Sequence, residues 1–136
     1  MGEFPMRVYR MIGIVNSCGS RTASGEEIIF NDPHPPPLKA IEAFHILSHD
    51  IRAAIIKSRR EWDLHEPKMW ARASSLSDAE LVTFNIQEDL VLCRSAPTSY
   101  GTIILGKIRL PVVEDEEGEG FVHVRLVTDY ELRSIH

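Results

Sequence analysis

Two histidines, His45 and His49, lie four residues apart in a segment with helical periodicity. This spacing places both imidazoles on the same side of a helix, where they can ligate one metal ion. The sequence between them lacks the glutamate that follows the first histidine in zinc-protease helices. Both histidines also lie away from the centre of the apolar stripe. We therefore interpret them as surface histidines, with a metal site as the alternative, and predict no cofactor.

Cys18 is the candidate for a catalytic nucleophile. It lies in a loop of small residues beside Arg21, a setting that can favour the thiolate form. A nucleophile also needs a positioned base, and no histidine lies near Cys18 in the sequence. We therefore expect a non-catalytic loop, with catalysis at Cys18 as the alternative. Cys93 alternates with apolar strand residues, which predicts a buried side chain.

A long amphipathic helix is the clearest element that the sequence predicts. From Leu38 to about Trp62, apolar residues recur at spacings of three and four. The prolines within residues 33–37 enforce an extended chain before it, and Pro37 suits the first helical position. The helix is long enough to cross an entire small sheet.

Strands are predicted on both sides of this helix from β-branched and alternating apolar residues. The pattern indicates an α+β fold in which one long amphipathic helix packs on a mostly antiparallel sheet of about five or six strands, in the order ββαββββ. We expect a single domain spanning residues 1–136. The predicted strands are residues 6–15, 26–30, 82–87, 90–94, 102–113 and 121–127.

The last two predicted strands indicate a hairpin closed by the acidic residues 114–120. Symmetrical pairing about this loop places Arg109 opposite His123 and Lys107 opposite Arg125. Apolar residues of the same strands then face the helix, and the cations face away from it. A second hairpin about residues 88–89 adds another cation to that face. The predicted binding surface consists of Lys107, Arg109, His123, Arg125 and Arg94.

Charge and composition limit the classes of partner. The net charge of −5 argues against a protein that coats nucleic acid or anionic lipid with its whole surface. Aromatic residues are not interleaved on the predicted basic face, so a platform for single-stranded nucleic acid is missing. Nucleic acid is therefore a minor alternative as a partner.

Targeting signals are not evident in the sequence. No apolar run reaches the length of about 18 to 20 residues that a membrane span requires, and the first 30 residues do not resemble a secretory signal. The two cysteines lie far apart in the sequence and do not suggest a disulfide framework. We expect a cytoplasmic or nuclear protein.

No family resemblance is evident, and function is open among three classes. The main hypothesis is a non-catalytic protein-interaction or assembly module that can bind another protein or itself, as a homodimer or larger oligomer. The lack of a coherent acid, base and nucleophile set favours this class over an enzyme. The first alternative is a small enzyme or ligand-binding domain with a pocket between helix and sheet. The second is binding of RNA or an anionic ligand by the basic outer face.

Overall fold

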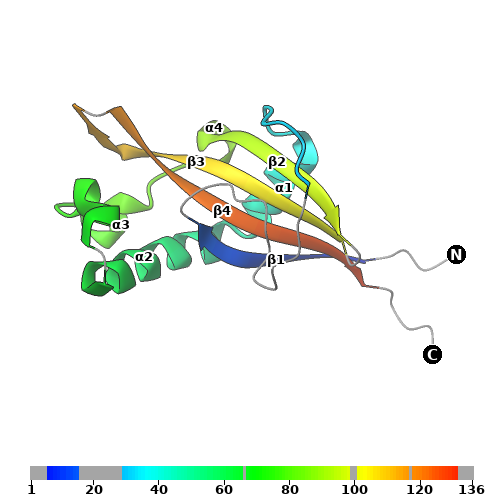
Figure 1. Cartoon of the computed structure of the whole chain (residues 1–136), viewed down its shortest axis with the longest axis horizontal. Helices are drawn as coiled ribbons and strands as arrows, with labels where there is room; N and C mark the ends of the chain where they lie inside the picture. The colour runs from blue at the N-terminus through cyan, green and yellow to red at the C-terminus, as the bar shows by residue number, and fades with distance from the viewer. Residues whose placement is uncertain (1–5, 16–28, 66, 99–100, 117, 132–136) are drawn as a thin grey trace, which may run out of the picture.

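Four antiparallel strands form one twisted sheet with the order β1-β4-β3-β2 (Figure 1). The structure, a computed structural model, describes residues 6–15, 29–65, 67–98, 101–116 and 118–131. It confirms the α+β class and the antiparallel sheet, but the described residues form four strands where we expected five or six. The strands are β1 (Met6–Val15), β2 (Leu90–Thr98), β3 (Gly101–Asp115) and β4 (Gly118–Glu131).

The helices of the described residues lie between β1 and β2 in the chain and contribute to one core with one face of the sheet. We call this the inner face, and the opposite side the outer face. None of these helices is long and apolar enough to cross a membrane. They are α1 (Leu38–Ile46), α2 (Ser48–His65), the 3-10 helix η1 (Pro67–Ala73), α3 (Asp78–Leu81) and α4 (Ile86–Asp89).

The predicted single long helix is wrong, because the chain turns at Leu47 between α1 and α2. Leu47 has φ −93° and ψ 10°, which departs from helical geometry. The apolar spacing nevertheless continues through the turn: Phe44, Leu47 and Ile51 are all buried. Periodicity reports which residues face the core, so it does not reveal this change of direction. Pro37, predicted as the first helical residue, is instead the N-cap of α1, and the helix begins at Leu38.

Residues 82–87, predicted to form a strand, instead lie in and between two short helices. The Ser77 hydroxyl accepts a hydrogen bond from the Glu80 backbone N–H, and the Glu80 carboxylate accepts one from that of Ser77. This capping box begins α3. The Asn85 side chain caps α4, so the predicted turn at residues 88–89 is helical. Local capping thus overrides the alternating apolar pattern.

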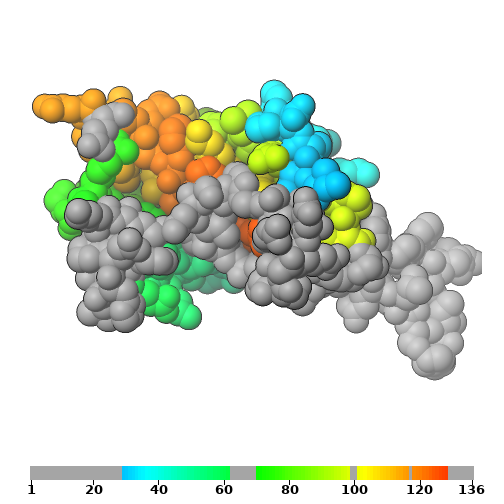
Figure 2. All heavy atoms as spheres, in the orientation of Figure 1, coloured from blue at the N-terminus to red at the C-terminus, as the bar shows by residue number. Residues whose placement is uncertain are grey.

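The other missing strand was predicted at residues 26–30, of which 26–28 lie outside the described residues. Ile29 and Phe30 are not in a strand. Residues 29–37, which we call the edge segment, run beside β2 (Figure 2). The backbone N–H of His34 donates to the Cys93 carbonyl oxygen at 3.0 Å, and the Cys93 N–H donates to the His34 carbonyl oxygen at 2.9 Å. The edge segment thus pairs with part of this edge of the sheet.

The β3–β4 hairpin has the predicted faces but not the predicted register. Lys107 lies opposite His123 and Arg109 opposite Phe121, a shift of two residues from symmetrical pairing about the acidic stretch. The acidic stretch is not a simple loop, since β3 continues to Asp115 and a bulge interrupts the pairing between Leu110 and Glu114. Because side chains alternate with a period of two, this shift keeps the residues of β3 up to Leu110 on their predicted face, whereas Val113, beyond the start of the bulge, also packs in the main core.

The two faces of the sheet carry separate apolar clusters. On the inner face, Ile108, Val124 and Leu126 pack with the helices in the main core. On the outer face, Phe30 of the edge segment packs with a smaller group that includes Leu105 and Val127. The edge segment therefore connects an outer-face anchor to the start of α1, which lies over the inner face.

Candidate functional site

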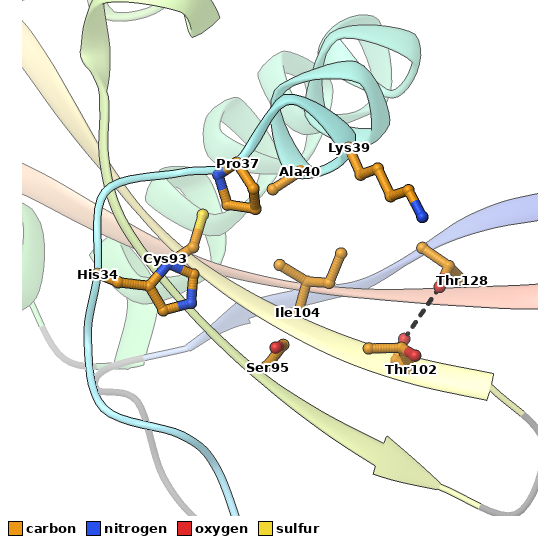
Figure 3. A pocket seen from close by; sticks show the side chains of 9 residues that line it. All are labelled: His34, Pro37, Lys39, Ala40, Cys93, Ser95, Thr102, Ile104 and Thr128. Carbon is orange, nitrogen blue, oxygen red and sulfur yellow. Dashed lines mark hydrogen bonds between the residues drawn. The ribbon is translucent and has the colours of Figure 1, made fainter.

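A cavity of about 290 Å³ lies where the start of α1 meets the inner face of the sheet (Figure 3). We call it the helix–sheet cavity. Its lining comes from the edge segment, the start of α1 and three strands, so it is built by the tertiary fold. The lining residues are His34, Pro37, Lys39, Ala40, Cys93, Ser95, Thr102, Ile104 and Thr128.

The lining of this cavity combines hydroxyl groups with an apolar wall. Ser95, Thr102 and Thr128 come from β2, β3 and β4 and lie on the inner face, where the register places them in or near one row. Thr128 is buried, and its hydroxyl donates to the Thr102 carbonyl oxygen at 3.5 Å. Ile104 and Ala40 provide apolar surface. The cavity can therefore offer hydrogen bonds and apolar contact to the same small molecule.

The charge of the cavity is positive. The exposed Lys39 side chain extends toward Thr128 (Figure 3), and the described lining residues include no aspartate or glutamate. The start of α1 lies at the same end, and its N-cap, Pro37, provides no side-chain hydrogen bond to the first backbone N–H groups. The unsatisfied N–H groups at a helix start carry partial positive charge, which adds to that of Lys39.

His34 and Cys93 lie together at one wall of the cavity (Figure 3). The Nδ1 atom of His34 lies 2.8 Å from the Pro35 carbonyl oxygen. Its Nε2 atom lies 3.3 Å from the Asn31 side-chain nitrogen. Both ring nitrogens thus contact the edge segment itself. Cys93 is buried, as the sequence predicts.

The five predicted binding residues all come from the outer-face positions of β2, β3 and β4, but they do not form one site. Arg109 donates from Nε to Asp89 Oδ1 at 2.9 Å and lies 3.7 Å from Glu119. The hydrogen bond to Asp89 raises the pKa of Arg109 above its ordinary value. Asp89 is buried, so Arg109 neutralises an internal carboxylate. Arg125 is itself buried and lies opposite Leu105, not opposite Lys107.

The other three predicted binding residues, Arg94, Lys107 and His123, line one cavity of about 190 Å³. We call it the outer-face cavity, and Leu105 and Pro33 also line it. Burial lowers the pKa of the half-buried His123 imidazole, and the positive charge of Lys107 lowers it further. The structure thus brings these three residues together, and their binding role stays a prediction.

The candidate metal ligands His45 and His49 line neither cavity. His45 and His49 are exposed and belong to α1 and α2, on either side of the turn at Leu47. Within the described residues, no group of three or more His, Cys, Asp or Glu side chains is placed to share a metal ion. Cys18 lies outside the described residues.

Sequence reasoning missed Lys39 and the three hydroxyl residues, although one signal was present. The predicted hairpin puts even-numbered residues of its strands on the helix side, which includes Thr102, and the same alternation continued by one residue includes Thr128. A polar side chain at a position that faces the core needs a hydrogen-bonding partner and often marks a site. No comparable signal in the sequence pointed to Lys39, because its place in the cavity lining depends on where α1 begins over the sheet.

Comparison of the chain with protein-family models, with curated proteins and with solved structures found no match. The site must therefore be interpreted from its own geometry. The interaction or assembly role that the sequence led us to expect stays a prediction.

Proposed function

We propose that this chain is a ligand-binding domain and that the helix–sheet cavity holds a small organic anion. The observation that carries this proposal is the lining itself: a lysine and three hydroxyl groups surround an apolar wall, with no carboxylate among the described lining residues. Its volume of about 290 Å³ lies at the lower end of small-molecule sites, which span about 300–1,000 Å³. A ligand with one acidic group and a short apolar part fits this chemistry.

Each end of such a ligand has a defined counterpart. The acidic group would lie near Lys39 and the start of α1, where the ammonium group and the helix end favour negative charge. The hydroxyls of Thr102 and Thr128 lie on the side toward which Lys39 extends (Figure 3). The apolar part would contact Ile104 and Ala40. We therefore propose a binding role for this cavity.

The test is an NMR titration with acetate, propionate and butyrate, three monocarboxylates that differ only in apolar length. Affinity should rise about fourfold with each added methylene that the cavity buries, because burial of one contributes about 0.8 kcal/mol. Amide shifts should concentrate at Lys39, Thr102 and Thr128. Lys39→Gln should weaken butyrate binding by roughly tenfold, since it removes a charge-assisted contact of about 1.4 kcal/mol.

Lys57→Gln is the matched control, because Lys57 is an exposed lysine of α2 paired with Glu61 at 3.8 Å, away from the cavity lining. It should leave butyrate affinity unchanged. Equal effects of the Lys39 and Lys57 substitutions, equal affinities along the carboxylate series, or shifts confined to other residues would each overturn the proposal.

A further inference from the structure

The geometry points to a second binding site on the opposite side of the sheet, and we infer that the outer-face cavity binds the phosphate group of a small molecule through Arg94, Lys107 and His123. These side chains come from three adjacent strands, β2, β3 and β4. Register explains why they meet: Lys107 lies opposite His123, and Arg94 lies opposite Leu105, the next outer-face residue of β3. This inference does not depend on the proposed carboxylate site.

The positive charge of this group is not neutralised within the described part of the chain. Lys107 Nζ lies 4.2 Å from the centre of the Phe121 ring. Arg94 lies over the Phe30 ring at 5.6 Å, and its Nε donates to the Asn31 carbonyl oxygen at 3.0 Å. Rings and carbonyl groups orient a cation but leave its full charge in place.

Arg109 provides the comparison on the same face. It lies one outer-face position from Lys107 on β3, but its guanidinium is paired with Asp89 and Glu119. A cation held in this way stabilises the fold and has little charge to offer a ligand. Arg94 and Lys107 have no such acid among the described residues that line the cavity. On β3, therefore, the charge of Arg109 is neutralised, whereas Lys107 keeps its positive charge beside Arg94.

His123 makes the site sensitive to protons. The described charged groups that face it are Lys107 from β3, Arg94 from β2 and Arg125, two residues away on β4. All are cationic, and burial together with Lys107 already lowers the pKa of His123. A bound divalent oxyanion would raise the pKa of His123 again, because its negative charge favours the imidazolium. Binding therefore takes up a proton and strengthens as the pH falls through the range in which His123 titrates.

A small phosphorylated molecule suits the site better than nucleic acid. The cavity holds about 190 Å³, and its two neighbouring rings, Phe30 and Phe121, are covered by Arg94 and Lys107. Covered rings do not provide the stacking platform on which single-stranded nucleic acid depends. The net charge of −5 also opposes a long polyanion more than a single phosphate.

The test uses calorimetry with glycerol phosphate, inorganic phosphate and sulfate on the full chain. Sulfate separates protein titration from ligand titration, because its own charge does not change over the range tested. Its affinity should rise several-fold from about pH 8 to about pH 5.5 in the wild type, and the rise should be absent in His123→Gln. Lys107→Gln should weaken all three ligands by about tenfold, whereas Lys57→Gln should not.

Lys39→Gln separates the two sites, since it should leave sulfate binding at the outer-face cavity intact. Far-UV circular dichroism and the thermal midpoint of each variant show that it is folded, and His123→Gln provides a second variant if Lys107→Gln is not. The inference is overturned by the absence of saturable binding, by equal affinities of Lys107→Gln and the wild type, or by a pH response that survives in His123→Gln. Binding of a single-stranded RNA that phosphate does not displace would also overturn it, in favour of a nucleic-acid surface.

Discussion

Replacing Gly106 with alanine should destabilise the fold, because this glycine lets the Phe44 ring of α1 pack directly on β3. A Cβ atom at position 106 would lie 2.7 Å from Phe44 Cε1 and 2.9 Å from Leu90 Cδ1, with Phe44 Cζ nearer still. Carbon atoms prefer separations of about 3.5–4.0 Å, so the ring would have to retreat by about 1 Å. Phe44 is fully buried in the main core, so its ring can move only by displacing the core residues around it.

The expected loss follows from two opposing terms. Overpacking a tight core costs about 1–3 kcal/mol, and this contact belongs at the upper end because a rigid ring is involved. Removing a glycine from the unfolded chain returns about 0.4–1 kcal/mol. The net loss should be about 2 kcal/mol. For a chain of 136 residues, this lowers the thermal midpoint by roughly 7 °C.

Urea unfolding, monitored by circular dichroism, measures this loss of stability. The m-value should stay unchanged, because the variant should expose the same surface on unfolding as the wild type. Phe44→Leu provides the decisive comparison, because it removes the ring that the new methyl group would meet. The double variant should be at least about 1 kcal/mol more stable than the sum of the two single losses predicts. Strict additivity, or a Gly106→Ala protein as stable as the wild type, would refute the proposed packing.

Three further predictions concern polar contacts. Arg109→Ala should lower the thermal midpoint, because it leaves the buried Asp89 carboxylate without its cation, and the effect should shrink in an Asp89→Asn background. The hydrogen bond from Arg59 lowers the pKa of Asp78 below 3.8. The ionised Asp78 therefore stabilises the fold above pH 3.8, and this stabilisation is lost as the pH falls through the lower pKa of the folded state. Acid unfolding of Asp78→Asn should lack this loss of stability. Ser77→Ala should cost about 1 kcal/mol in urea unfolding, because it removes a hydroxyl that caps α3.

Side-chain periodicity made the faces of the sheet predictable, but not its register. The bulge between Leu110 and Glu114 adds residues to β3 alone, so pairing that assumes equal strands about the acidic stretch is displaced. The displacement is an even number of residues, and Ile108 therefore faces the core as predicted. The predicted pairing of Lys107 with Arg125 is wrong for the same reason, since it depended on the register and not on the face.

The helix–sheet cavity was not predictable residue by residue, because it depends on where distant segments meet. His34 and Lys39 reach it because the edge segment pairs with Cys93 and so fixes where α1 begins. Nothing local in residues 34–39 specifies that pairing. The proline-rich sequence did predict an extended approach to the helix, and the backbone of Pro37 confirms this at its end.

One local error also explains why the sequence analysis counted Arg109 among the binding residues. Residues 88–89 were interpreted as a hairpin turn, which places Asp89 at an exposed end of the sheet. The Asn85 cap makes this segment α4 instead, and the buried Asp89 carboxylate then accepts hydrogen bonds from both Arg109 and the Asn85 backbone N–H. A capping signal in residues 85–89 thus decides whether a cation twenty positions later is free to bind a ligand. The availability of a charge on a sheet face depends on the helix beside it as much as on the strand that carries it.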